Sequence, residues 1–498
     1  MKFLLAISGA FIVLILAARA SAHVGSPDVF LEGNAGPYRL FVTVRVPQVI
    51  PGVAEVEIRS ESDDVQEIRI APMQLTGPGS QFAPTADVAR RSRTDPQFFT
   101  GNLWLMEFGS LQVRIDVGGA RGHGELAVPV PAVAQRTLPI GRPLGISLFA
   151  LMALLASALI SIAAAAVREG GLEPGAVPAP VNWRRARLAM AVAAAVVAGL
   201  LFVGGEWWRS DASRYARNVY RPPDVDAVLD PSGRLLLHQR PARMAAGNPR
   251  RAANVIDFDN LILDHGHLMH FFMIRTPGMD SFWHLHPERV AGGLFAEDLP
   301  AIPPGRYELF ADVVLTSGFP VTMVGSLDVA RVTGRMPTGD DSGIVGDYLS
   351  AGANEANSYS LPDGGRIVWE RERGPFKPST PVIFHFRVED SSGKPARDLE
   401  PYMGMAAHAE IVRSDGSVFA HVHPSGSVSM AALAIAQAGL PGRSAEQAGM
   451  SMMDMPAEAV DSEISFPYGF PRPGLYRIFV QVKRSGRIET GVFDVTVE

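Results

Sequence analysis

Short runs of alternating apolar and polar residues fill the chain between residues 23 and 140. The clearest runs cover residues 38–46, 54–58 and 111–117, and clusters of Gly, Pro and Asp separate them. An alternation of period two predicts strands with one buried face, and turn residues at these intervals are typical of a β-sandwich. Because no amphipathic helical pattern competes with this one, we expect residues 23–140 to form an immunoglobulin-like β-sandwich.

The chain after residue 221 shows the same short alternating runs separated by turn residues, and it contains an internal repeat. Each copy has a histidine that opens an apolar strand, then a His-x-His-Pro element, then a Pro-Gly turn that leads into an alternating strand. The repeated histidines are His270, His284 and His286 in the first copy and His408, His421 and His423 in the second. Self-similarity in matching order indicates two copies of one domain. We assign residues 222–332 to the first β-sandwich and 343–498 to the second, with the boundary in the Gly/Asp/Ser stretch 332–347.

Three uncharged apolar stretches predict membrane targeting. Residues 3–18 follow a positively charged start and precede an Ala-Ser-Ala site that ends at Ala22. This pattern is typical of a secretory signal peptide, here residues 1–22, with cleavage after Ala22; an uncleaved anchor helix is the alternative. Residues 144–167 and 188–205 carry no charge, and each run is long enough to cross a hydrocarbon core of about 30 Å.

The signal peptide sets the predicted orientation of the two spans. Because the chain from residue 23 onward is exported, residues 141–206 form a transmembrane helical hairpin and residues 168–187 its cytoplasmic loop. Arginines are frequent in this loop, as the positive-inside rule expects, although arginines also flank the outer ends of the spans. The sequence therefore predicts a mainly β protein of the bacterial inner (cytoplasmic) membrane, with three sandwich domains in the periplasm or extracytoplasmic space.

Composition narrows the chemistry that the chain can carry. Among 498 residues, 45 basic and 51 acidic side chains give a formal net charge of −6, and there is no cysteine. The acidic balance argues against nucleic-acid binding, and the lack of thiols rules out cysteine zinc sites, Fe–S clusters and cysteine nucleophiles. No P-loop, G-x-G-x-x-G, G-x-S-x-G or H-E-x-x-H motif occurs, so no nucleotide is expected as a partner and nothing nominates an enzyme active site.

A turn signal predicts how the histidines of the second repeat pair. Asp415-Gly416 at the centre of a two-residue loop fixes the register of a hairpin, so His408 lies directly opposite His423. His421 is two residues from His423 and therefore points to the same face. Three imidazoles on one face form a candidate metal site.

The first repeat predicts the same arrangement through a loop that is one residue longer. Residues 277–279 form that loop, and the register again pairs His270 with His286, with His284 on their face. Imidazoles from two adjacent strands can close on one ion with metal–nitrogen distances of about 2.0 Å. The alternative is that His-x-His-Pro is a structural corner, with its imidazoles hydrogen-bonded to loop carbonyls.

Further ligand candidates point to copper, as Cu(I) or Cu(II). His265 and His267 precede the first strand of repeat 1, and Met403 and Met405 occupy the same offsets in repeat 2. Exchange of imidazole for thioether suits copper, because both groups bind copper and thioether favours Cu(I). An insertion at about 430–462 adds the cluster Met450, Met452, Met453 and Met455. The cluster is a candidate Cu(I)-capture loop or the tail of an apolar helix over residues 430–440.

The N-terminal domain offers a separate copper candidate. Cleavage after Ala22 leaves His23 as the first residue, and its α-amine and imidazole can chelate Cu(II) together. His123 is the remaining histidine of this domain, and it would complete a histidine brace, with Asp28 as the alternative third ligand.

These motifs support a resemblance to known families. Residues 399–405, His408, the Phe-Ala-His-Val-His-Pro element at 419–424 and residues 470–480 resemble YtkA-like β-sandwich domains of bacterial envelope proteins. Residues 264–287 look like a second such domain. The N-terminal domain is similar in layout to periplasmic copper-resistance (CopC-type) sandwiches. The resemblance implies β-sandwich folds and a tendency toward copper handling.

The main functional hypothesis is a membrane-tethered protein that captures or passes copper in the periplasm. Its expected partners are the lipid bilayer and other periplasmic copper proteins or a membrane complex. Two hypotheses from other classes stay open: a mono-copper oxidoreductase that uses the His23 brace, and an envelope scaffold whose histidines are structural.

Overall fold

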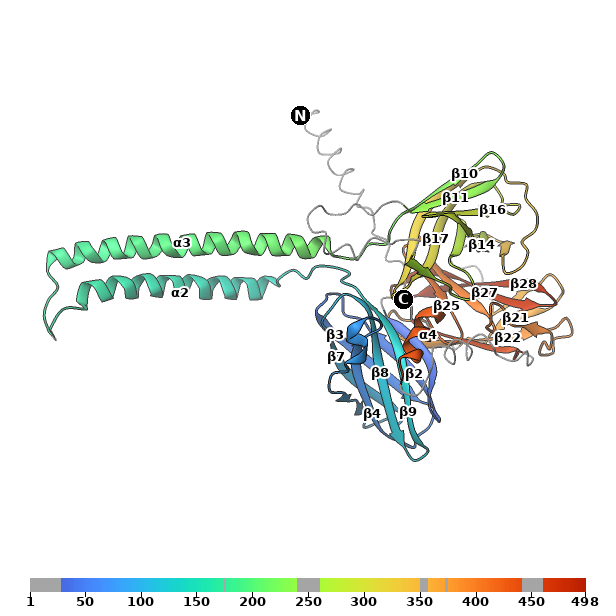
Figure 1. The fold of residues 1–498 in the computed structure, drawn as a ribbon, viewed down its shortest axis with the longest axis horizontal. Helices are drawn as coiled ribbons and strands as arrows, with labels where there is room; N and C mark the ends of the chain where they lie inside the picture. Colours follow the sequence, from blue (N-terminus) through green and yellow to red (C-terminus); the bar gives the residue numbers. More distant parts are fainter. Residues whose placement is uncertain (1–27, 174, 240–259, 350–356, 372–374, 441–459) are drawn as a thin grey trace. The chain divides into compact units, whose positions relative to one another are not determined.

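The computed structural model describes residues 28–173, 175–239, 260–349, 357–371, 375–440 and 460–498. They form two compact units, one made of the chain before residue 134 and after residue 220, the other of residues 134–220. The first unit is mainly antiparallel β-structure and the second is helical (Figure 1). The mainly β class predicted from the sequence is confirmed.

The N-terminal region has two sheets that enclose one apolar core. The first sheet contains, in spatial order, β1 (Val29–Ala35), β2 (Tyr38–Arg45), β3 (Gly52–Ser60), β7 (Phe98–Leu105) and β6 (Arg90–Arg91). The second contains β5 (Asp87–Val88), β4 (Val65–Gln74), β8 (Gly109–Gly119) and β9 (Gly122–Ala132), with the 3-10 helix η1 (Pro78–Gln81) after β4. Alternation explains the strands: along β3, Ala54, Val56 and Ile58 enter the core and the residues between them face outward.

The first repeat also has two sheets around one core. The smaller sheet contains β10 (Val225–Leu229), β11 (Arg234–Gln239), β16 (Leu294–Asp298) and β15 (Glu288–Ala291). The larger contains β12 (Leu261–Ile262), β17 (Gly305–Leu315), β13 (His270–Thr276), β14 (Ser281–Leu285) and β19 (Ser342–Val345), with β18 (Pro320–Val329) paired to β17. Because β19 pairs with β14, residues 343–345, which the sequence analysis placed in the second repeat, complete the larger sheet of the first.

The second repeat has the same plan. Its smaller sheet contains β20 (Ser358–Ser360), β21 (Arg366–Trp369), β22 (Val382–Glu389) and β26 (Glu463–Tyr468). Its larger sheet contains β23 (Leu399–Glu400), β27 (Gly474–Arg484), β24 (His408–Arg413) and β25 (Phe419–Val422), with β28 (Arg487–Val497) paired to β27. All three β regions are therefore sandwich-like pairs of sheets, and their immunoglobulin-like character stays a prediction.

A short helix, α4 (Met430–Ala438), leaves the second repeat between β25 and β26. The Ser429 side chain caps it by accepting the N–H of Ala432 at 3.1 Å. Ala432 and Ala436 pack with Ala127 of β9 in the N-terminal region. The helix predicted as the alternative for residues 430–440 is therefore present, and it joins the second repeat to the N-terminal sandwich.

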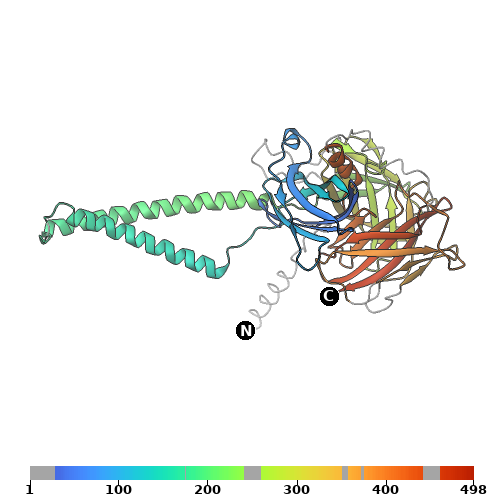
Figure 2. The same cartoon turned by 90° about the horizontal axis from the view of Figure 1, so that it is seen from below.

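The helical unit contains two long apolar helices, α2 (Arg142–Glu169) and α3 (Pro180–Arg217), which contact each other near their connection and diverge away from it (Figure 2). Both are long and apolar enough to cross a membrane, and none of the apolar 18-residue stretch that qualifies each helix is buried within the protein. These properties are consistent with association with a lipid bilayer. The connection is shorter than the predicted loop 168–187, because Pro180 occupies the first turn of α3, where its missing N–H costs no hydrogen bond.

Candidate metal centre

The two repeats contact each other through the faces of their larger sheets. Along β13, Phe271 and Met273 enter the core of the first repeat, whereas Phe272 and Ile274 belong to a separate cluster shared by both repeats. The other members of this interface cluster are Met279, Phe282 and Phe310 of the first repeat and Val412, Phe419 and Phe479 of the second. Strand alternation places the histidines on the same face as the interface residues.

Both hairpin registers predicted from the turns are confirmed. Glu410 pairs with His421 in the second repeat, and Phe272 pairs with His284 in the first. The histidines predicted to lie opposite each other have ring centroids 5.0 Å apart for His270 and His286 and 5.1 Å apart for His408 and His423. The turn residues alone therefore predict correctly which of these rings lie opposite each other.

The turn in the second repeat is wider than the predicted two-residue loop. The Ser414 N–H donates to the Leu475 carbonyl at 2.9 Å, so it does not close the hairpin. Asp415 accepts the N–H of Ser417 at 3.0 Å and organises the turn from its side chain. The register survives because the wider turn has the same centre.

His270, His284 and His286 form the first triad. The three residues are 2%, 0% and 8% exposed, and one nitrogen of each lies within 4.8 Å of the others. This is the set that the sequence predicted for the first repeat.

The second triad differs from the predicted set. It contains His408 and His423 of the second repeat, but its third member is His265 of the first repeat, not His421. The ring of His421 lies between the triads, with centroids 5.3 Å from His270 and 5.4 Å from His408. The second triad therefore crosses the interface between the repeats.

A tight turn carries His265 across the interface. Asp264 and His267 exchange two backbone hydrogen bonds of 2.8 and 3.0 Å around His265 and Gly266, which have φ values of 51° and 86°. These left-handed values describe a type I′ turn. The repeat-2 counterpart is the turn at Met403-Gly404, with φ values of 50° and 79°.

Backbone carbonyls fix the tautomers in the second triad. Nδ1 of His265 lies 2.9 Å from the Met403 carbonyl oxygen, and Nδ1 of His423 lies 3.1 Å from that of Val428. A carbonyl only accepts, so both Nδ1 atoms carry the proton and both Nε2 atoms present lone pairs when the rings are neutral. Those two Nε2 atoms face each other at 3.2 Å. Two facing lone pairs require a cation, either a proton on one ring or a metal ion bound by both.

His408 favours the metal ion. Its side chain is 0% exposed, and neither ring nitrogen has a hydrogen-bond partner among the described residues. A buried polar atom without a partner costs free energy. One proton satisfies the pair His265 and His423 only, whereas one metal ion bound by both would also take one ring nitrogen of His408. Burial, together with the neighbouring His265 and His423, also lowers the pKa of His408 well below its usual value.

The first triad is oriented in the same way. Nε2 of His270 donates to the Asp264 carbonyl at 3.0 Å, and Nδ1 of His286 donates to the Asp341 carboxylate at 2.9 Å. Nδ1 of His284 lies 2.9 Å from the amide oxygen of Gln481 in the other repeat. The opposite nitrogens are left for a ligand, and those of His270 and His284 face each other at 3.2 Å. Such partners hold metal-binding imidazoles in place in proteins.

The spacing of the rings fits one ion per triad. Three imidazoles bound tetrahedrally would place their nitrogens about 3.3 Å apart and their ring centroids about 5.2 Å apart, given metal–nitrogen distances of 2.0–2.1 Å. The centroid distances are 5.5, 5.0 and 4.7 Å in the first triad and 5.1, 4.8 and 5.1 Å in the second. Small side-chain adjustments would therefore complete either site.

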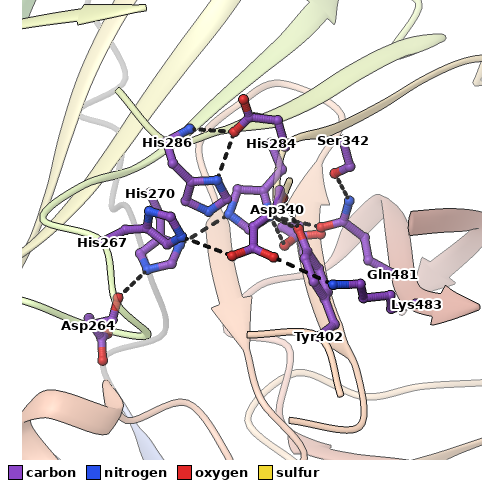
Figure 3. A network of polar contacts seen from close by, with 12 residues as sticks. Asp264, His267, His270, His284, His286, Asp340, Ser342, Tyr402, Gln481 and Lys483 are labelled. Atoms are coloured by element: carbon purple, nitrogen blue, oxygen red, sulfur yellow. Dashed lines mark hydrogen bonds and ion pairs between the residues drawn. The ribbon is translucent and has the colours of Figure 1, made fainter. Parts of the chain in front are cut away.

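His267 is half-buried and approaches Asp340 (Figure 3). Its ring stacks on His286 with centroids 3.9 Å apart, and its Nε2 lies 3.2 Å from the Asp340 carboxylate. Tyr402 donates from its hydroxyl to the Asp340 carbonyl at 2.8 Å. The segment that carries Asp340 and Asp341 therefore lines the first triad with acceptors.

Two acids lie beside the histidines, Glu410, which is buried, and Asp312, whose side chain is 23% exposed. Both carboxyl oxygens of Glu410 and Oδ1 of Asp312 lack a hydrogen-bond partner within the described part of the chain. Burial, then the neighbouring Asp312, raises the pKa of Glu410 well above its usual value. Burial raises the pKa of Asp312 to about 7. Both acids therefore favour the neutral form far more than exposed carboxyls do.

The methionine and N-terminal candidates are placed apart from the triads or outside the described residues. Met403 contributes its carbonyl to His265, and Met405 packs against the core of the N-terminal sandwich. His123 forms an ion pair with Asp116. His23 and the four methionines Met450, Met452, Met453 and Met455 lie outside the described residues.

Several residues of the cluster were not predicted from the sequence. Glu410 and Asp312 had a usable signal, since each is a charged residue within a strand, and Glu410 is two residues from His408. Gln481 had no usable signal, because its place opposite His408 follows only from the pairing of β24 with β27. Asp340 and Asp341 had none, because they lie in a stretch with the composition of a linker.

Comparisons with known proteins add little to this geometry. Residues 361–498 match the model of a domain of unknown function, DUF8832. The search of curated proteins found no match. Among solved structures, an engineered protein is similar at 17% identity and a TM-score of 0.15, over 18% of this chain and 20% of its own. An ICAM-5 D1–D4 ectodomain fragment matches at 9% identity and a TM-score of 0.16, over 93% and 77%. The E. coli alpha-2-macroglobulin matches at 8% identity and a TM-score of 0.19, over 96% and 23%. Likenesses at these scores carry no argument.

Proposed function

We propose that this protein binds copper in the two histidine triads between its repeats, and that α2 and α3 anchor it in a membrane with its β unit outside the cytoplasm. The observation that carries the metal-binding part is the pair of Nε2 lone pairs of His265 and His423, 3.2 Å apart, with both Nδ1 protons committed to backbone carbonyls. If these histidines had only a structural role, two hydrogen-bond acceptors, the Nε2 atoms of His265 and His423, would not be expected to face each other.

The donor set supports copper among the metals that imidazole binds. Each triad offers three imidazoles and no carboxylate or thiolate, a set that suits copper, zinc and nickel better than calcium or magnesium. Copper(II) has the highest affinity of the divalent first-row ions for a given site. The full chain has no cysteine, which fits an oxidising compartment where copper is handled without thiols.

The role proposed for the bound copper is capture and transfer. The triads consist of metal ligands only, a composition that suits binding and transfer of the ion. The resemblance to YtkA-like and copper-resistance sandwiches points the same way and stays a prediction.

Metal analysis of the full-length chain in detergent tests copper binding. After chelator treatment and addition of Cu(II), Cu(I) or Zn(II), we expect copper to be retained through desalting and to raise the melting temperature. The stabilisation should be about 2.7 kcal/mol when free copper is a hundred times the Kd. His408→Gln should lose part of the copper, whereas His385→Gln, an exposed histidine of β22, should behave as wild type. No retention by wild type, or zinc retained in preference to copper, would contradict the proposal.

Cysteine labelling tests the proposed topology, and the absence of native cysteine makes each label specific. Ser391→Cys, at an exposed turn of the β unit, should react with a membrane-impermeant maleimide in intact spheroplasts. Ala176→Cys, in the exposed connection between α2 and α3, should react only after permeabilisation. The reverse labelling pattern would mean that the membrane orientation is opposite to the one proposed.

A further inference from the structure

The two triads are not equivalent, although the repeats that supply them are copies. All three ligands of the first triad come from one repeat, and each is held by an acceptor: the Asp264 carbonyl, Gln481 or Asp341. In the second triad, His265 and His423 are held by carbonyls, but His408 is held by nothing within the described residues. The second site is therefore less organised before it binds an ion.

Exposure adds a second difference. The first triad is buried throughout, whereas His265 of the second triad is half-buried and lies on a turn at the edge of the cluster. Exchange with solvent or with a partner protein is consequently easier at the second site. The two triads share no residue. Loss of an ion from the second triad would therefore leave all three ligands of the first triad in place.

The triads are close enough to form one centre. Rings of the two triads approach with centroids 5.9 Å apart for His265 and His270. Since a bound ion lies about 3.2 Å from the centroid of each of its imidazoles, two ions would be at most about 12 Å apart. The ring of His421, with a buried Nε2 that has no partner among the described residues, lies between the triads.

From these observations we infer that the cluster is a two-ion centre with unequal sites. The first triad holds a tightly bound ion within repeat 1, and the second triad holds an exchangeable ion that bridges the two repeats. The inference rests on the proposed copper binding and adds the stoichiometry, the order of loading and the site from which copper is passed on.

Chelator release from the copper-loaded, full-length chain tests this inference. Wild type should hold two ions per chain in the cluster, one released at least about tenfold faster than the other, because well-placed supporting residues contribute roughly 10- to 100-fold in affinity. His265→Asn should remove the fast ion only, since Asn tolerates the left-handed turn but is a poor copper ligand. His286→Gln should remove the slow ion. The control His385→Gln, at an exposed histidine of β22 that belongs to neither triad, should release both ions as wild type does.

Dipolar splitting in the EPR spectrum of the Cu(II)-loaded chain provides an independent readout. Wild type should show an interaction that corresponds to a separation within about 12 Å, given the same metal–imidazole geometry, and either single-site variant should lose it. One ion per chain, two ions released at one rate, or loss of both ions in His265→Asn with the apo fold intact by circular dichroism would overturn the inference while leaving copper binding standing. Should His265→Asn alter the apo fold, His408→Gln removes the same ion and takes its place. No bound copper at all would instead overturn the proposed function.

Discussion

The two repeats pack against each other as near-symmetric partners but differ where they meet the histidines. Phe310 of the first repeat stacks on Phe419 of the second with centroids 4.3 Å apart, and Phe479 of the second stacks on Phe282 of the first at 4.2 Å. Each pair is the counterpart of the other under exchange of the repeats. These two stacked pairs are therefore duplicated, whereas Phe272 of the interface cluster has Glu410 as its counterpart in the second repeat.

The polar half is asymmetric at equivalent positions. Asp312 lies opposite His270 in the first repeat, and Gln481 lies opposite the counterpart histidine, His408, in the second. Gln481 reaches across to His284 at 2.9 Å, whereas Asp312 lies 3.7 Å from His421, too far for a hydrogen bond. The comparison teaches that packing maintains the pairing of the repeats, while single polar exchanges decide which histidines are ready to bind an ion.

The largest expected effect tests the symmetric half. Phe282→Ala and Phe419→Ala each remove a fully buried ring from the interface, which typically costs about 3–5 kcal/mol of unfolding free energy. Because the two rings occupy counterpart positions and stack on counterpart partners, urea unfolding should give costs within about 1 kcal/mol of each other, a difference smaller than the spread of about 2 kcal/mol among typical Phe→Ala costs. Phe82→Ala, at a side chain that is 76% exposed, is the control and should change little. A large difference between the two interface variants would mean that the apparent symmetry has no energetic counterpart.

The next prediction tests the asymmetric half. Gln481→Leu removes the acceptor that orients His284, so the copper affinity of the first triad should fall roughly 10- to 100-fold, as expected for loss of a supporting hydrogen bond. Asp312→Leu should leave both affinities within about threefold, because its neighbour His421 belongs to neither triad; a threefold change is about 0.65 kcal/mol. Competition titrations with a copper chelator measure both. Equal losses in the two variants would show that His421 is a ligand after all.

How far the sequence predicted this site depends on which contacts define it. Turn residues determined both hairpin registers, so His270, His284 and His286 were assembled correctly from local information, and the apolar runs predicted α2 and α3. His265 could not be assigned to His408 and His423, because that contact exists only once the repeats dock. The role of Gln481 is also invisible in the sequence, because it supports a histidine of the other repeat.

A pH prediction uses the buried ring that lies between the triads. Burial, then the charge of His423, lowers the pKa of His421 well below its usual value. The metal-free folded chain therefore keeps His421 neutral, and the unfolded chain protonates it below about pH 6.5. Because only the unfolded chain gains this proton, the stability that the neutral ring allows is fully present above that pH and is lost as the pH falls below it.

His421→Gln should consequently make the stability of the metal-free chain less sensitive to acid. Between about pH 6 and 5, the slope of unfolding free energy against pH should fall by up to about 1.4 kcal/mol per pH unit, the value for one proton. Urea unfolding at several pH values measures the slope. His385→Gln, at an exposed position, should leave it unchanged, and an unchanged slope in His421→Gln would mean that this ring is protonated in the folded chain.

The smallest effect concerns the turns that set the two registers. Gly416 has φ of 69° in the second repeat, whereas the left-handed position in the first repeat is Met279, with φ of 49° and a side chain buried in the interface cluster. A Cβ at Gly416 would meet nothing closer than Cγ of Glu308 at 3.8 Å, so Gly416→Ala has steric room and pays only for its backbone conformation. We expect a loss of about 1 kcal/mol in unfolding free energy, with Gly416→Asn less affected because Asn tolerates this region.

Copper content should remain that of wild type in both variants, because the register depends on the centre of the turn and not on the residue type at Gly416. Urea unfolding and metal analysis of the same preparations check both parts. Loss of copper from a stably folded Gly416→Ala would show instead that the turn positions His408 and His423 more tightly than their strand pairing does.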